Sequence, residues 1–123
     1  MSGQSLVLVG LSGVVQGEVF PIGYGKSVVV GRSRSCDISL RNCKQWLESE
    51  ESRKTPDQSS KTVSRKHLKI SFHNANSIEV EDLSSNGTFV DGKRIDRVVL
   101  TDLKDRPHEV RMGAGEVFRL EWR

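Results

Sequence analysis

Cysteine is scarce in this sequence, which holds only Cys36 and Cys43 and no CxxC motif. So few cysteines exclude a disulfide scaffold and a cysteine-type zinc site. Long apolar runs are missing too, since no stretch approaches the roughly 18 residues that a membrane span requires. The N-terminus also lacks the basic region of a signal peptide. We therefore expect an intracellular protein, cytoplasmic or nuclear, with two free thiols and no membrane partner.

Motifs for catalysis and for cofactors are also absent from the sequence. It has neither the glycine-rich phosphate loop of nucleotide-binding proteins nor a GxGxxG motif. Ser64 and His67 lie close together, but no acidic partner or oxyanion motif accompanies them, as nucleophilic catalysis would require. His67 and His73 would lie about 20 Å apart along a strand, which is too far for a shared metal ion. The sequence predicts no catalytic residue, no metal and no cofactor.

Alanine is rare, whereas β-branched residues are common. The 123 residues include 2 alanines but 15 valines, 5 isoleucines and 4 threonines. Branched side chains are stiff at χ1 and suit the pleated surface of a sheet. A chain of this length corresponds to about one domain. We therefore expect a single all-β domain over residues 1–123.

Apolar segments alternate with turn signals along most of the chain. Leu68, Ile70 and Phe72 alternate with polar residues, as in a strand with one buried face. Asp91-Gly92, directly after an apolar pair, is typical of a two-residue hairpin turn. These patterns indicate about ten strands and favour an antiparallel β-sandwich. The expected strands include residues 6–9, 19–22, 27–30, 67–72, 78–81, 89–90, 98–100, 110–112 and 117–122.

One polar segment, residues 41–62, interrupts this pattern and predicts an insert. Apolar residues at helical spacing favour a short helix around 42–52. Residues 53–60 contain nothing that would support a core, so we expect a mobile loop there. Thr55 precedes a proline in that loop and fits a proline-directed kinase. We hypothesise that the phosphorylated insert occupies a binding site of the same or another molecule.

Positive charge is concentrated in one part of the chain. The whole chain has 19 Lys and Arg against 16 Asp and Glu, a net charge of +3. Residues 31–70 hold 10 basic and 5 acidic side chains, a net charge of +5, whereas residues 71–123 hold 8 and 10, a net charge of −2. An anionic partner is therefore favoured near residues 31–70. Nucleic acid is one alternative, but we disfavour it because no DNA- or RNA-binding motif accompanies the basic segment.

Three short motifs lie at the ends of expected strands, where loops on a rigid sandwich commonly carry binding groups. Each motif alone is typical of an ordinary turn or surface loop. The motifs are Gly31-Arg32, Ser64-Arg65-Lys66-His67 and Ser85-Asn86-Gly87-Thr88. Together and in this order they resemble the forkhead-associated (FHA) domain family, and the resemblance covers roughly residues 5–122, the expected core of the domain. The likeness includes residues 28–38, where we expect Cys36 to be buried near a strand at Ile38, and residues 63–70 and 80–92.

The FHA resemblance implies eleven strands in two sheets, with binding loops at one end. It implies recognition of a protein segment that a Ser/Thr kinase has phosphorylated on threonine. On the matching positions, Arg32 and Ser64 would bind the phosphate, and Arg65 would contact the phosphopeptide. Asn86 would hydrogen-bond the peptide main chain, with help from Ser85. Three further positions would shape the loops: Gly31, His67 and Gly87.

Two departures from the family pattern leave questions open. The segment 41–62 lengthens the connection between the first two motifs, next to the expected phosphate site. The family's usual Gly-Asp pair is not evident after residue 100, so the sequence does not fix the strand boundaries there. The main alternative function is a protein-interaction FHA domain that does not need phosphate. Binding to a phosphopeptide but not to its unmodified twin distinguishes the two functions.

Overall fold

The computed structural model describes residues 5–43, 63–74 and 76–123, whose backbone is mostly extended. Eleven strands and two short 3₁₀ helices follow one another within these ranges. The strands are β1 (Leu6–Ser12), β2 (Val19–Ile22), β3 (Ser27–Gly31), β4 (Ile38–Ser39), β5 (Leu68–Asn74), β6 (Ser77–Asp82), β7 (Thr88–Val90), β8 (Lys93–Ile95), β9 (Arg97–Leu100), β10 (His108–Met112) and β11 (Glu116–Trp122). The helices are η1 (Gly13–Val15) and η2 (Leu40–Asn42). The expected all-β class is confirmed.

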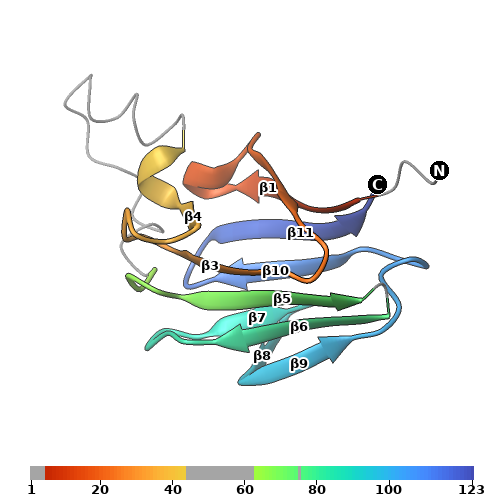
Figure 1. Ribbon diagram of the computed structural model, residues 1–123. Coiled ribbons are helices and arrows are strands. Elements are labelled where there is room, and N and C mark those ends of the chain that lie inside the picture. The colour runs from red at the N-terminus through yellow and green to blue at the C-terminus, as the bar shows by residue number, and fades with distance from the viewer. Residues whose placement is uncertain (1–4, 44–62, 75) are drawn as a thin grey trace.

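The strands form two sheets that pack face to face (Figure 1). The six-stranded sheet has the order β2-β1-β11-β10-β7-β8, and the five-stranded sheet has the order β4-β3-β5-β6-β9. Paired strands are antiparallel throughout the described sheets except for β3 and β4, which run parallel. The predicted antiparallel β-sandwich is therefore confirmed, and one short parallel pair adds to it.

Alternating apolar residues explain how the two sheets hold together. In β5, Leu68, Ile70 and Phe72 are all buried, as their spacing predicts. In β11, Phe118 and Leu120 belong to the same core cluster. Burying one such side chain stabilises the fold by about 1.5–3 kcal/mol. The result is a rigid support for the loops at its ends.

The predicted hairpin after β7 is confirmed. Asp91 and Gly92 join β7 to β8, and their φ angles are 52° and 84°. Both residues lie in the left-handed region, as a type I′ turn requires. β8 shows no apolar alternation of its own, so the turn is its main sequence signal. The sequence did not fix the strand boundaries after residue 100. The structure places the last two strands, β10 and β11, at His108–Met112 and Glu116–Trp122.

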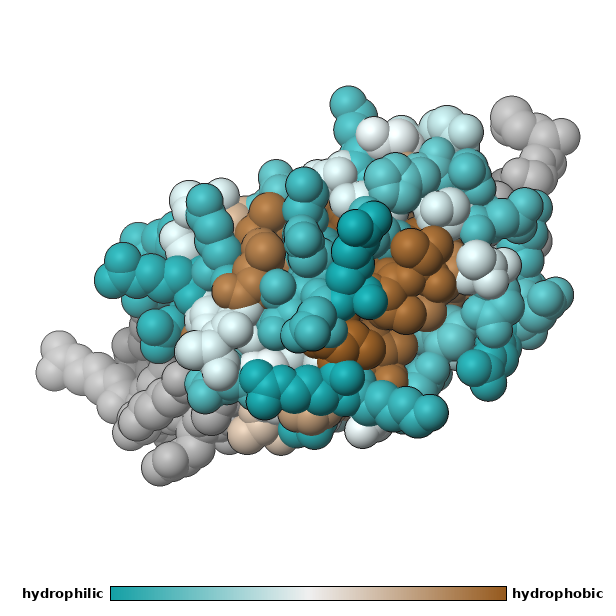
Figure 2. All heavy atoms as spheres, turned by 90° about the horizontal axis from the view of Figure 1, so that it is seen from below, coloured by the Kyte–Doolittle hydropathy of each residue, from teal (hydrophilic) through white to brown (hydrophobic). Residues whose placement is uncertain are grey.

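The open edge of the sandwich between β8 and β9 leaves apolar side chains partly exposed. Figure 2 views the molecule from below Figure 1 and shows apolar residues among hydrophilic ones on this face. Ile95 on β8 and Val98 on β9 pack against the core but are only partly buried. Lys93, Arg94 and Arg97 are exposed on the same two strands. Such charged residues disfavour edge-to-edge pairing with another sheet.

Loops that are distant in the sequence meet at one end of the sandwich. The loop after β3, the segment before β5 and the β6–β7 loop all lie at the left end in Figure 1. The β2–β3, β5–β6 and β9–β10 connections lie at the opposite end, near the C-terminus. The three sequence motifs therefore occur at one end, as the FHA resemblance implies.

Only the beginning of the predicted insert at 41–62 falls within the described residues. η2 ends just before Cys43, which has an extended backbone with φ −73° and ψ 143°. Most of the helix expected around 42–52 lies outside the described residues. The loop expected at 53–60 lies outside them as well, and so does Thr55. Cys43 itself is 1% exposed, so the start of the insert belongs to the core.

Both cysteines are free, as the sequence predicts, and both are buried. Cys36 precedes β4 and lies near Ile38 in the fold, as expected. Burial raises the pKa of the Cys43 thiol to about 12, so this thiol stays protonated and unreactive. No helix in the described ranges has the length and apolar character needed to cross a membrane.

Candidate functional site

Backbone hydrogen bonds join the loop after β3 to the segment before β5. The Arg32 N–H donates to the Ser64 carbonyl oxygen at 3.0 Å, and the Ser33 N–H donates to the Arg65 carbonyl oxygen at 3.0 Å. These bonds lie just beyond Val30 and Leu68, the last paired residues of β3 and β5 at this end of the sheet. Arg32 and Arg65 are thereby brought together from two different motifs.

Gly31 allows these two segments to approach each other. A Cβ atom at this position would lie 2.2 Å from the Arg65 carbonyl oxygen and 2.8 Å from the Arg65 carbonyl carbon. Both are backbone atoms, which cannot rotate away as the end of a flexible side chain does. Glycine is thus required at the end of β3 for steric reasons, which explains the Gly-Arg pair.

His67 links the segment before β5 to the β6–β7 loop. Its side chain is fully buried, its Nδ1 accepts the Ser64 N–H at 3.0 Å, and its Nε2 lies 2.7 Å from the Gly87 carbonyl oxygen. Only the neutral ring with the proton on Nε2 satisfies both bonds. Burial lowers the pKa of His67, which favours this neutral form. The predicted supporting role of His67 fits this geometry.

The β6–β7 loop is organised by the Asp82 carboxylate at the end of β6. Its Oδ1 accepts the Ser84 N–H at 2.9 Å, the Ser84 hydroxyl at 2.6 Å and the Thr88 hydroxyl at 2.9 Å. Burial alone would raise the pKa of Asp82, but these hydrogen bonds hold it below its usual value. The Ser84 hydroxyl in turn accepts the Gly87 N–H at 2.8 Å, and Gly87 has a φ of 101°. The loop is therefore fixed by side-chain bonds at both ends.

Ser64 stands between the two loops. Its hydroxyl oxygen accepts the Ser85 N–H at 3.3 Å, which leaves its own hydrogen available as a donor. Ser85 and Asn86 are exposed at the tip of the β6–β7 loop, whereas Gly87 behind them is buried. The tip thus presents polar side chains beside Ser64.

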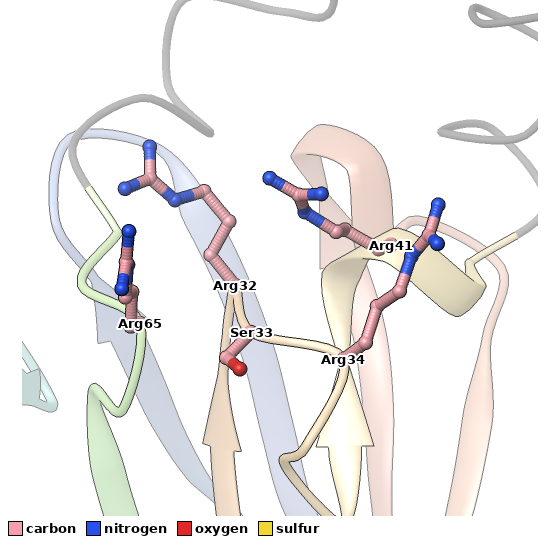
Figure 3. A pocket seen from close by; sticks show the side chains of 5 residues that line it. All are labelled: Arg32, Ser33, Arg34, Arg41 and Arg65. Atoms are coloured by element: carbon pink, nitrogen blue, oxygen red, sulfur yellow. The ribbon is translucent and has the colours of Figure 1, made fainter.

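Four arginines line one polar pocket at this end of the sandwich. The pocket has a volume of about 390 Å³, and its lining residues are Arg32, Ser33, Arg34, Arg41 and Arg65. Figure 3 shows the guanidinium groups of all four arginines reaching beyond the ends of the strands. The four groups carry a total charge of +4, because a guanidinium stays protonated in proteins. The pocket is thus suited to bind anions.

The charges of Arg32, Arg34 and Arg65 are not paired with acidic side chains in the part of the chain that the structure describes. Arg34 and Arg65 are exposed, and Arg32 is partly buried. These donors are therefore free to bind an external anion.

The structure adds residues to those that the sequence motifs singled out. Arg32 and Arg65 line the pocket, Ser64 lies next to Arg65 in the segment before β5, and Ser85 and Asn86 lie on the neighbouring β6–β7 loop. Ser33, Arg34 and Arg41 line the pocket but were missed by the motif comparison. The only sequence signal for these arginines was the net charge of +5 over residues 31–70.

A second, larger cavity lies at the opposite end of the sandwich. It has a volume of about 490 Å³ and is mainly apolar, with Ser5, Leu6, Pro21, Ile22, Gly23, Tyr24, Phe72 and Trp122 as its lining residues. None of these side chains is charged, so this cavity does not suit a phosphate. Within the described part of the chain, no group of three metal-ligating side chains occurs.

The sequence profile of the FHA domain family matches residues 28–113, which include all three motifs. The chain therefore belongs to the FHA domain family. Family members are protein-interaction modules rather than a class of enzymes. Among curated proteins, no sequence matches this FHA domain.

Solved structures of other FHA domains share this fold. The FHA domain of the CT664 protein from Chlamydia trachomatis is 30% identical, with a TM-score of 0.67, and the match covers 95% of this chain and 96% of that one. EmbR of Mycobacterium tuberculosis, solved in complex with a low-affinity phosphopeptide, is 24% identical with a TM-score of 0.64, covering 95% of this chain and 24% of that one. An FHA domain from a study of phosphothreonine-dependent interactions is 23% identical with a TM-score of 0.64, covering 94% of each chain.

Proposed function

We propose that this FHA domain binds a partner protein that a Ser/Thr kinase has phosphorylated on threonine. The observation that carries the proposal is the juxtaposition of Arg32 and Arg65 in one pocket, next to the Ser64 hydroxyl, with no ion pair between either arginine and a carboxylate of the described residues. Structures of FHA domains with phosphopeptides or in phosphothreonine-dependent interactions support it.

The chemistry of the ligand matches the donors in this pocket. A phosphate at pH 7 carries a charge of about −1.5 to −2 and three strong acceptor oxygens. Arg32 and Arg65 offer two planar sets of N–H donors, and the Ser64 hydroxyl offers a third donor. Charge-assisted hydrogen bonds of this kind contribute about 1.5–3 kcal/mol each. The phosphate therefore provides most of the affinity for the peptide.

The β6–β7 loop has a different role in this proposal. Asn86 hydrogen-bonds the peptide main chain, and Ser85 assists it from the adjacent position. Gly31, His67 and Gly87 do not contact the peptide but hold the two loops in register. A mutation at one of these three positions therefore weakens peptide binding indirectly, because it displaces the loops that carry the binding residues.

The experiment is a binding screen against degenerate peptide libraries that contain phosphothreonine, phosphoserine or unmodified threonine. We expect selective binding of the phosphothreonine library and at least about tenfold weaker binding by the Arg32→Ala variant. Lys93→Ala is the matched control, because Lys93 is an exposed cation on β8, outside the pocket.

The outcomes separate the two functions considered for this FHA domain. Binding that does not depend on phosphate or on Arg32 would replace the proposal with a phosphate-independent interaction. Equal binding of phosphoserine and phosphothreonine would keep the phosphate site but remove the preference for threonine. Loss of binding in Lys93→Ala as well would indicate diffuse electrostatic attraction instead of a site.

A further inference from the structure

A ladder of three side chains, Arg94, Phe89 and Arg111, crosses the outer face of the six-stranded sheet. Phe89 on β7 lies directly opposite Arg94 on β8 and, on its other side, directly opposite Arg111 on β10. Opposed residues of antiparallel strands share one face of a sheet. The neighbours of Phe89 in β7, Thr88 and Val90, are buried, so the three side chains of the ladder point away from the core.

Arg111 is held in place by two contacts. Its guanidinium carbon lies 4.0 Å from the centre of the Phe89 ring, and its Nη1 donates to the Gly113 carbonyl oxygen at 2.8 Å. A guanidinium group that stacks on an aromatic ring still presents N–H donors at its edge. Arg111 is therefore positioned beforehand and retains donors for a ligand.

Arg94 connects the ladder to the β6–β7 loop. A Cβ atom placed on Gly87 would lie 3.1 Å from Arg94 Nε and 3.3 Å from Phe89 Cε1, so the Arg94 side chain packs over Gly87. Gly87 follows Asn86, which the proposed function places on the peptide main chain. The ladder thus begins directly beside the proposed path of the peptide.

No carboxylate of the described residues forms an ion pair with either arginine of the ladder. Arg94 is exposed and Arg111 is partly buried. Glu109 is the only carboxylate of β10, and it lies opposite Arg119 on β11. The ladder therefore adds two positive charges next to the β6–β7 loop, outside the pocket that Arg32 lines. Such a surface favours an acidic partner.

We propose that Arg94, Phe89 and Arg111 extend the phosphopeptide site and bind acidic residues of the same partner segment, on one side of the phosphothreonine. This inference rests on the proposed function, because the bound phosphothreonine brings the segment to the β6–β7 loop. A carboxylate carries one negative charge and accepts two parallel N–H bonds from a guanidinium, so Asp and Glu side chains suit both arginines. The partner is thus a segment in which an acidic stretch flanks the phosphothreonine.

The length of the ladder sets the length of the acidic stretch. Neighbouring strands lie about 4.8 Å apart, so the ladder spans about 10 Å from β8 to β10. An extended chain rises about 3.3 Å per residue and covers this distance with about three residues. A block of about four acidic residues is therefore long enough to reach both arginines.

The test lengthens the best peptide from the phosphothreonine library by such a block at one end or the other. The block consists of glutamates, glutamines or lysines. Affinities are measured by titration calorimetry at physiological ionic strength, which screens distant charges. We expect the glutamate block to tighten binding about fivefold relative to the glutamine block, at one end of the peptide only.

The decisive variant is Arg94→Gln combined with Arg111→Gln. We expect it to reduce the gain, expressed as the ratio of the dissociation constants for the glutamine and glutamate peptides, to less than about twofold. This ratio cancels any effect of the variant on the phosphate site itself. The matched control is Lys26→Gln combined with Lys93→Gln, which removes the same charge from exposed sites and keeps the gain. Lys93 precedes Arg94 but lies opposite the buried Val90, so it belongs to the other face of β8.

A second variant, Arg94→Glu combined with Arg111→Glu, reverses the charge of the ladder. We expect this variant to bind the lysine peptide more tightly than the glutamate peptide, at the same end of the peptide at which glutamate favours the unmodified domain. A merely structural role of the two arginines would not produce this reversal.

The possible results distinguish this inference from the proposed function. An equal gain at both ends, or a gain that survives Arg94→Gln with Arg111→Gln, would overturn the extension of the site. A charge-reversed variant that still prefers glutamate would overturn it too. No gain at either end, with binding still dependent on Arg32, would overturn only the extension. No binding of any phosphothreonine peptide would overturn both.

Discussion

At Gly31, a single absent methyl group determines whether two loops meet. Alanine there would place its Cβ 2.2 Å from the Arg65 carbonyl oxygen, so the segment before β5 has to move. We predict that Gly31→Ala destabilises the fold by about 1–3 kcal/mol, the usual range for overpacking a tight site. Phosphopeptide binding should weaken too, because Arg65 and Ser64 shift away from Arg32. Urea unfolding and peptide titration measure the two effects.

Gly23→Ala is the control for this prediction. A Cβ atom at Gly23 would meet only the flexible Lys26 side chain, at 3.1 Å from its Cγ. We expect Gly23→Ala to change the free energy of unfolding by no more than about 0.5 kcal/mol, as most surface substitutions do. If Gly31→Ala were as stable and as active as Gly23→Ala, close approach at Gly31 would not be important.

Single residues also show how far the sequence could predict this site. Arg32 and Arg65 occur in motifs with neighbours of fixed type, so they were singled out, and the structure places both in one pocket. Arg34 and Arg41 have no such pattern around them. Their position depends on the turn at Ser33 and on the burial of Leu40, which follow only from the folded chain.

At the scale of elements, apolar patterns predicted the strands that contribute most to the core. β5 and β11 alternate clearly, and both were expected within a few residues of their bounds. β8 is polar and short, so only its hairpin turn indicated it. The parallel pairing of β4 with β3 is a contact between chain segments, which no local pattern encodes.

The β6–β7 loop depends on one carboxylate. We predict that Asp82→Ala destabilises the fold by about 1–3 kcal/mol, because the buried Thr88 hydroxyl and the Ser84 N–H lose their acceptor. Phosphopeptide binding should weaken as well, since Ser85 and Asn86 lie on this loop. The hydrogen bonds lower the pKa of Asp82, so its stabilising effect is present above the unfolded pKa of about 3.8 and is lost as the pH falls through the folded value.

Urea unfolding at neutral and acidic pH tests this prediction, with Asp96→Ala as the control. Asp96 is an exposed residue in the β8–β9 turn, and removing its side chain should have little effect. The difference in the free energy of unfolding between Asp82→Ala and Asp96→Ala should become smaller as the pH falls. A constant difference would mean that Asp82 acts through packing and not through its charge.

At the scale of the whole molecule, two buried histidines link the protein's stability to pH in opposite directions. His67 lies at the binding end, and burial lowers its pKa. At the other end, His108 is 5% exposed and bridges Asp91 Oδ2 at 2.5 Å and Asp102 Oδ1 at 2.6 Å. Burial alone would lower the pKa of His108, but these hydrogen bonds raise it. The bridge connects the β7–β8 turn to the β9–β10 loop.

The signs of the two effects follow from linkage. The pKa of His67 is lower in the folded than in the unfolded protein. His67 therefore stabilises the fold fully above its unfolded pKa of about 6.5, and this stabilisation decreases as the pH falls below that pKa. The pKa of His108 is higher in the folded than in the unfolded protein. His108 therefore stabilises the fold fully below its unfolded pKa of about 6.5, and this stabilisation is lost as the pH rises through the pKa of the folded protein. Together they give a stability maximum near the unfolded pKa.

We predict that the free energy of unfolding, measured with urea between about pH 5 and 8, has a maximum near pH 6.5. His108→Gln should remove the fall on the alkaline side, because the variant loses the stabilisation that is present at low pH. His73→Gln is the control, since its side chain is 54% exposed. Phosphopeptide affinity should stay within about twofold in His108→Gln, because the bridge lies at the end opposite the binding loops. An unchanged pH profile in this variant would show that the imidazolium bridge does not stabilise the fold, and the alkaline fall would then need another group.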